Sequence, residues 1–146
     1  MVYLAGERIT AARINRLKPA VYDATGSGNI ALSTTEADVT SASVTLTTET
    51  SGAYYVVHGV FAFDITSATT SFATGVLQLD GSSVLGNARW SGEVTTDFGT
   101  DTQIWRGAVG TAGSHTFKLR ASMSAGTGIQ VLGAFTKILV TIYEEV

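Results

Sequence analysis

From Asn29 onward, apolar and polar residues alternate with a period of two, and this alternation constrains the fold more than any other feature. A period of two places successive side chains on opposite faces of a strand. No segment sustains the 3.6-residue period of an amphipathic helix. Asp80-Gly81 is a typical hairpin turn, and residues 111–114 can join another pair of strands. The pattern predicts an all-β body.

The spacing of the turn residues predicts strands whose connections suit a two-sheet antiparallel jelly-roll sandwich. The clearest alternation lies in His115 to Met123, where Phe117 and Leu119 face one side while Lys118 and Arg120 face the other. That strand is therefore expected to have one solvent-exposed face. The expected strands cover residues 30–33, 43–48, 54–66, 75–80, 83–90, 102–109, 115–123 and 129–143.

Two of these strands, over residues 54–66 and 129–143, carry apolar side chains on both faces. A sandwich buries only one face of each sheet, so the second apolar face needs a cover. Identical subunits of a homo-oligomer can supply that cover, and we expect them to meet here. A docked N-terminal helix or a thick core could cover the same residues instead. The expected oligomer interface consists of Tyr54, Val56, His58, Val60, Val131, Phe135, Leu139 and Tyr143.

The first 20 residues differ from the rest of the chain in charge, with a formal charge of +3 against a net charge of −3 for the whole sequence. Thr10 can cap a helix that Pro19 ends after about two turns, which is too short to be stable alone in water. Such a helix must dock on another surface. We therefore expect an anchoring arm with a short helix at residues 1–28 and the sandwich at residues 29–146. The expected anchoring residues are Ile9, Arg13, Ile14, Arg16 and Leu17.

The composition excludes several classes of function. The chain has no cysteine, so it can form neither a disulfide nor a cysteine-ligated zinc site. A sequence pI near 5.2 leaves no broad basic surface for phosphates, so no nucleic-acid partner is expected. No run of about 18 apolar residues and no secretory signal is present, so no membrane partner is expected either.

Motifs of catalytic and metal sites are also absent from the sequence. No serine lies in a G-x-S-x-G frame, and the two histidines, His58 and His115, fall on different expected strands with no nearby sequence partner for acid-base catalysis. Residues 97–101 lack the alternating oxygen ligands of a calcium loop. We expect no enzymatic activity, no cofactor and no bound metal.

The two tryptophans offer an alternative function. Trp90 and Trp105 flank a segment rich in Gly, Thr and Asp, and exposed rings beside polar residues are typical of sugar-binding sites. Tryptophans at strand ends more often fill a sandwich core. A carbohydrate-binding module that adheres to a host receptor, with Trp90 and Trp105 as its glycan contacts, is thus the second interpretation.

Residues 3–17, YLAGERITAARINRL, resemble the N-terminal motif of many virion structural proteins of tailed bacteriophages, especially phages of actinobacteria. Each position of that motif, from the aromatic residue and Ala-Gly through hydrophobic-Thr-Ala to hydrophobic-Asn-x-Leu, is matched. The body resembles the tumour-necrosis-factor-like jelly roll that such proteins often carry, through residues 54–65, 77–81 and 113–121. That fold class is usually trimeric, and its threefold contact uses the sheet that holds the counterparts of the two doubly apolar strands.

The resemblance implies a bacteriophage virion protein that is made in the bacterial host cytoplasm. The N-terminal arm is then expected to attach a homotrimeric knob to other virion proteins of the capsid or the tail. Capsid decoration, a head fibre and a tail component all fit this description. A host cell-surface glycan is a further expected partner of such a knob.

Overall fold

The computed structural model describes residues 18–144. The expected N-terminal helix and all five expected anchoring residues lie outside the described residues. The described part contains ten strands and one short 3-10 helix. The elements are β1 (Ala20–Thr25), β2 (Asn29–Ala31), β3 (Ala37–Thr48), β4 (Tyr54–Ile65), β5 (Phe72–Leu79), β6 (Ser82–Ser91), β7 (Phe98–Ala108), β8 (Gly113–Met123), β9 (Ile129–Leu132), η1 (Gly133–Phe135) and β10 (Lys137–Tyr143).

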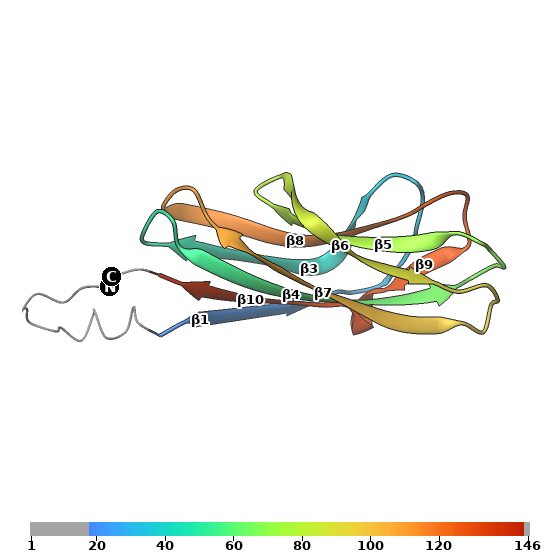
Figure 1. Cartoon of the computed structure of the whole chain (residues 1–146). Coiled ribbons are helices and arrows are strands. Elements are labelled where there is room, and N and C mark those ends of the chain that lie inside the picture. The colour runs from blue at the N-terminus through green and yellow to red at the C-terminus, as the bar shows by residue number, and fades with distance from the viewer. Residues whose placement is uncertain (1–17, 145–146) are drawn as a thin grey trace, which may run out of the picture.

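The strands form two antiparallel sheets that stack as a sandwich, as the alternation predicts (Figure 1). Sheet B has the order β3-β8-β5-β6. In sheet A, β4 pairs along its whole length with β7 on one side. On its other side it pairs first with β10, which in turn pairs with β1, and then with β9, which pairs with β2. This arrangement confirms the predicted all-β jelly-roll sandwich.

Sheet A extends further toward the N-terminus than the sequence suggested. β1 pairs with β10 in the register Ala20↔Ile142 to Thr25↔Lys137, so the sandwich begins at Ala20 and not at residue 29. Nearly all of β1 is exposed, because it lies at an edge of the sheet and only Ala24 packs against the core. A strand with so little buried apolar surface leaves a weak pattern in the sequence.

The single strand expected over residues 129–143 is wrong, because η1 interrupts it between β9 and β10. The Gly133 N–H donates to the Gly28 carbonyl at 2.8 Å, and a Cβ atom at Gly133 would overlap that carbonyl. The interruption changes which residues face inward. Val131 is consequently buried in the core, so its expected place on an outward-facing interface is also wrong.

The core lies between the two sheets and is rich in aromatic rings, including Phe61, Phe63, Trp105 and Phe117. Phe61 and Phe63 are stacked with ring centroids 5.9 Å apart. Gly75 makes room for this packing, since a Cβ atom there would lie 2.6 Å from the Phe61 ring. A large ring on sheet A is thus accommodated by a glycine, which has no side chain, on sheet B.

Candidate functional site

The outward-pointing side chains of β1, β10, β4 and β7 form one continuous surface, which we call the outer A face. The strand register aligns these side chains in rows across the sheet. One row runs Asp23, Leu139, His58 and Ile104, the next runs Val21, Thr141, Val56 and Arg106, and a third runs Tyr143, Tyr54 and Ala108.

The outer A face exposes large apolar side chains within the described residues. Tyr54 is 43% exposed, Leu139 37% and Tyr143 45%, and Ile104 is exposed beside them. Isolated exposed apolar residues are ordinary, but a contiguous group on one face marks an interaction surface.

The structure brings most of the expected interface residues together on this face. His58 is exposed at its centre, whereas Val56 and Val60 are half-buried between neighbouring strands. Phe135 lies on η1, next to β10, and is exposed. Only Val131 points into the core. The alternation in β4 and β10 therefore predicted the outward-facing side chains correctly.

A shallow hollow of about 270 Å³ opens on the outer A face and is lined by Tyr54, Val56, Arg106 and Tyr143. The rings of Tyr54 and Tyr143 have centroids 6.3 Å apart and are tilted by 53° to each other. Arg106, which forms no ion pair with any residue in 18–144, supplies the one charged group of the lining. The hollow therefore offers one cation in apolar and aromatic surroundings.

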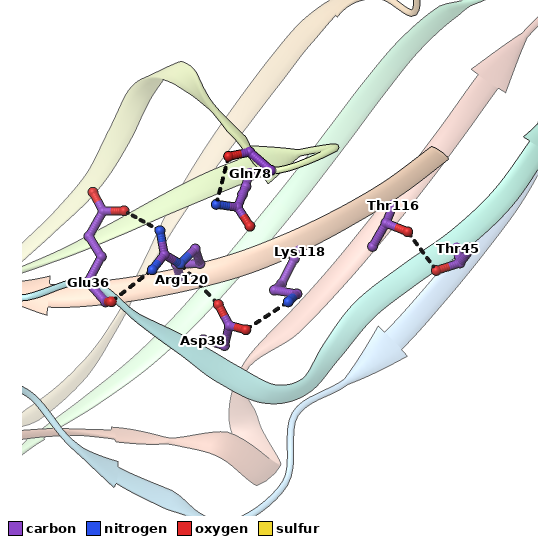
Figure 2. Close-up of polar contacts among 8 residues, drawn as sticks. Glu36, Asp38, Thr45, Gln78, Thr116, Lys118 and Arg120 are labelled. Atoms are coloured by element: carbon purple, nitrogen blue, oxygen red, sulfur yellow. Dashed lines mark hydrogen bonds and ion pairs between the residues drawn. The ribbon is translucent and has the colours of Figure 1, made fainter. Parts of the chain in front are cut away.

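The outward face of sheet B, which we call the outer B face, has the opposite character (Figure 2). Asp38 accepts hydrogen bonds from Lys118 Nζ at 2.7 Å and from Arg120 Nε at 3.0 Å. Arg120 also donates to the Glu36 carboxylate at 2.9 Å. The hydrogen bond from Lys118, aided by the charges of both cations, lowers the pKa of Asp38 below its usual value. These four charged residues are satisfied within one chain.

The two tryptophans do not form an exposed pair. Trp105 is only 2% exposed, and its Nε1–H donates to the Gly86 carbonyl at 2.8 Å, so the indole closes the core between β7 and β6. The expected glycan contact at Trp105 is therefore wrong. Trp90 is half-buried and stacks on Phe63, with ring centroids 5.9 Å apart.

A second hollow, of about 430 Å³, lies in the loop that follows Trp90. Asp97 Oδ2 accepts hydrogen bonds from the backbone N–H groups of Glu93 and Val94 at 2.8 and 3.2 Å, and these bonds lower the pKa of Asp97. No aromatic ring from the described part of the chain lines this hollow, so it lacks the stacking surface that sugar sites commonly use. Its residues are Thr70, Ser91, Gly92, Glu93, Val94 and Asp97.

The described residues contain no cluster of three or more potential metal ligands. His115 is buried, and both of its ring nitrogens are engaged, by Asp80 and by the Thr111 carbonyl. Sequence reasoning missed this pairing because Asp80 lies 35 positions away on another hairpin. Within residues 18–144, no helix has the length and apolar character that a membrane crossing needs.

No protein-family model and no curated protein matches the sequence. Solved structures match its fold at low sequence identity. A chain of the infectious bursal disease virus Gt strain superposes with a TM-score of 0.55 and 14% identity, over 86% of this chain and 33% of that one. Murine APRIL at pH 5.0 gives a TM-score of 0.53 and 7% identity, over 85% of this chain and 98% of that one.

A third match is the dimeric latent PorU from Porphyromonas gingivalis, with a TM-score of 0.50 and 12% identity over 86% of this chain and 13% of that chain. The chain thus spans a third or less of the viral and bacterial chains but nearly all of the murine one. Likeness at such identities establishes the fold alone, and that fold is a jelly roll shared with murine APRIL and with a viral protein.

Proposed function

We propose that this chain is a non-enzymatic structural protein of a tailed-bacteriophage virion. In this proposal it forms a homotrimeric surface knob, and its N-terminal segment anchors the knob to other virion proteins. The observation that carries the proposal is the contrast between the apolar outer A face and the ion-paired outer B face. The phage motif in residues 3–17 supplies the virion assignment, and the jelly-roll fold is compatible with it.

The difference between the two faces favours assembly through sheet A. Each Å² of apolar surface removed from water contributes about 25 cal/mol, so covering Tyr54, Leu139, Tyr143 and Ile104 favours association. The outer B face gains less from a partner, because its cluster of Glu36, Asp38, Lys118 and Arg120 is already ion-paired within the chain. Each copy in the knob therefore buries its outer A face and leaves its outer B face exposed.

The mass of the full chain in solution tests the assembly. Size-exclusion chromatography with light scattering at micromolar concentration is expected to give three times the 15.2 kDa chain mass. A stable monomer would contradict the proposed trimer.

The anchoring role is tested by removing residues 1–17, which leaves β1 intact because that strand begins at Ala20. The shortened chain is expected to keep the trimer mass and to be lost from assembled particles, whereas the full chain is incorporated. Normal incorporation of the shortened chain would contradict the anchor. Imaging intact particles that carry the tagged full chain would distinguish capsid decoration or a head fibre from a tail component.

A further inference from the structure

We propose that the copies of this chain meet head to tail, with Asp23 of one copy in the hollow beside Arg106 of the next. This inference rests on the proposed trimer and specifies which edges of sheet A come together. It deepens the proposed function by naming the residues of the contact.

The two residues lie at opposite edges of one half of sheet A. Asp23 is on β1, which pairs only with β10, and Arg106 is on β7, which pairs with β4. Both are exposed, and both point to the outer A face, because their registers place them in the rows of Leu139 and Val56. The outer A face therefore has an acidic edge and a basic edge.

Neither charge is satisfied within the described chain. Among residues 18–144, Asp23 and Arg106 take part in no ion pair, whereas Glu36, Asp38, Lys118 and Arg120 of the outer B face all do. A charge on a face that becomes buried costs several kcal/mol unless it meets an opposite charge. If the outer A face is covered by identical copies, Arg106 therefore needs an acid from the neighbouring copy.

The shapes of the two edges are also complementary. The hollow places the Arg106 guanidinium beside Val56 and two tyrosine rings. On β1, Val21 and Asp23 lie two residues apart on the same side, and Val21 is 59% exposed. An apolar side chain followed by a carboxylate matches a hollow that offers apolar walls and one cation.

The proposed trimer determines the symmetry of the contact. Copies arranged around a three-fold axis meet through two different patches, and such a contact closes as a ring when the rotation between copies closes. Asp23 and Arg106, at opposite edges of the outer A face, supply these two patches. In a two-fold dimer the same ion pair would form twice across one interface, so the mass of the parent distinguishes the two arrangements.

Charge exchange in the full chain tests the pairing. Asp23→Arg and Arg106→Asp are each expected to raise the dissociation constant of the trimer at least about tenfold, measured by sedimentation equilibrium. The double variant is expected to return to within about threefold of the parent, because the ion pair is restored in reverse. Circular dichroism checks that each chain is folded. Asp23→Asn and Arg106→Gln, which remove charge without repulsion, are expected to weaken the trimer less.

Lys137 provides a matched control, because within residues 18–144 it is the other cation on the outer A face without an ion pair, and it lies on β10 close to Asp23. Lys137→Asp is not expected to restore assembly to Asp23→Arg. The pairing would be overturned if Lys137→Asp restored assembly to Asp23→Arg. It would also be overturned if the double Asp23/Arg106 variant lost as much association free energy as its two single changes together. Neither outcome would contradict a trimeric parent. A monomeric parent would instead overturn the proposed function itself, and a dimeric parent would overturn the ring.

Discussion

The buried imidazole of His115 lies 2.7 Å from Asp80, measured from Nδ1 to Oδ2. Its other nitrogen, Nε2, is 2.9 Å from the Thr111 carbonyl. Carboxylate and carbonyl oxygens both accept hydrogen bonds, so the ring satisfies them best as an imidazolium that donates from both nitrogens. The hydrogen bond with Asp80 is the main cause that raises the pKa of His115. Burial raises the pKa of Asp80, but hydrogen bonds from His115 and the Thr116 N–H outweigh it and leave that pKa lowered.

The His115–Asp80 pair predicts a specific dependence of stability on pH. A raised pKa in the folded state stabilises the protein below the unfolded value of 6.5 and loses this contribution as the pH rises through the folded value. The lowered pKa of Asp80 has the opposite consequence, with stability lost as the pH falls below 3.8. The pair therefore contributes most between these two values, and the free energy of unfolding is expected to fall as the pH is raised above 6.5.

Asp80→Asn isolates this contribution. The substitution suits the backbone, because Asp80 has a φ of 49° in the hairpin turn and Asn tolerates that region. We expect a loss of about 1 kcal/mol in the free energy of unfolding near pH 6, since one hydrogen bond to a charged group is weakened. Urea denaturation at fixed protein concentration, repeated across the pH range, measures the difference. Parallel pH profiles for the parent and Asp80→Asn would contradict a charged pair.

The regular strands were predictable from the sequence because one face of each strand packs in the core and the other faces water. In β8, Phe117 and Leu119 are buried and Lys118 and Arg120 are partly exposed, as the alternation indicates. The break at Gly133 was not predictable, since it depends on contact with Gly28, more than a hundred positions away. A local period carries no information about such a long-range contact.

The candidate site was predictable only in part, for a similar reason. The outward residues of β4 follow from the pattern, but the burial of Trp105 depends on small residues on other strands. The Trp105 ring occupies the space that a side chain at Gly59 would fill, and its indole nitrogen reaches Gly86. Asp23 and Arg106 face the same surface only because β10 and β4 lie between their strands. Composition and spacing do not reveal this placement.

A methyl group at Gly75 is expected to destabilise the fold. A Cβ atom there would lie 2.6 Å from the Phe61 ring, which is fully buried and cannot move without disturbing its neighbours. Gly75→Ala should therefore lower the free energy of unfolding by about 1 to 3 kcal/mol. Gly110→Ala is the matched control, because a methyl group at that position would meet no atom of a non-adjacent residue within 4 Å, and its change should stay within about 0.5 kcal/mol. Equal losses for the two variants in urea denaturation would contradict this view of the core.

The two tryptophans are expected to differ in their contribution to stability. Trp105→Phe removes the donor to the Gly86 carbonyl and leaves a cavity in the core, so a loss of about 2 to 4 kcal/mol is expected. Trp90→Phe, at a half-buried ring that stacks on Phe63, should cost less and keep the stacking. Thermal and urea denaturation of both variants measure the order. A larger loss of stability for Trp90→Phe than for Trp105→Phe would contradict the greater contribution of Trp105 to the core.

A single charge on the outer A face is expected to separate the copies without unfolding them. Leu139 lies between Asp23 and His58 in the strand register and is 37% exposed, so Leu139→Lys is compatible with a folded chain in water. Within an assembled face the same ammonium group would be buried and would compete with Arg106 of the neighbouring copy for Asp23, at a cost of several kcal/mol. We expect light scattering to report a monomer at micromolar concentration, with an unchanged circular dichroism spectrum. Thr45→Lys places the same charge on the outer B face, beside Thr116, and should leave the mass of the parent assembly unaltered. A Leu139→Lys chain that keeps the parent mass would show that the copies do not meet through sheet A.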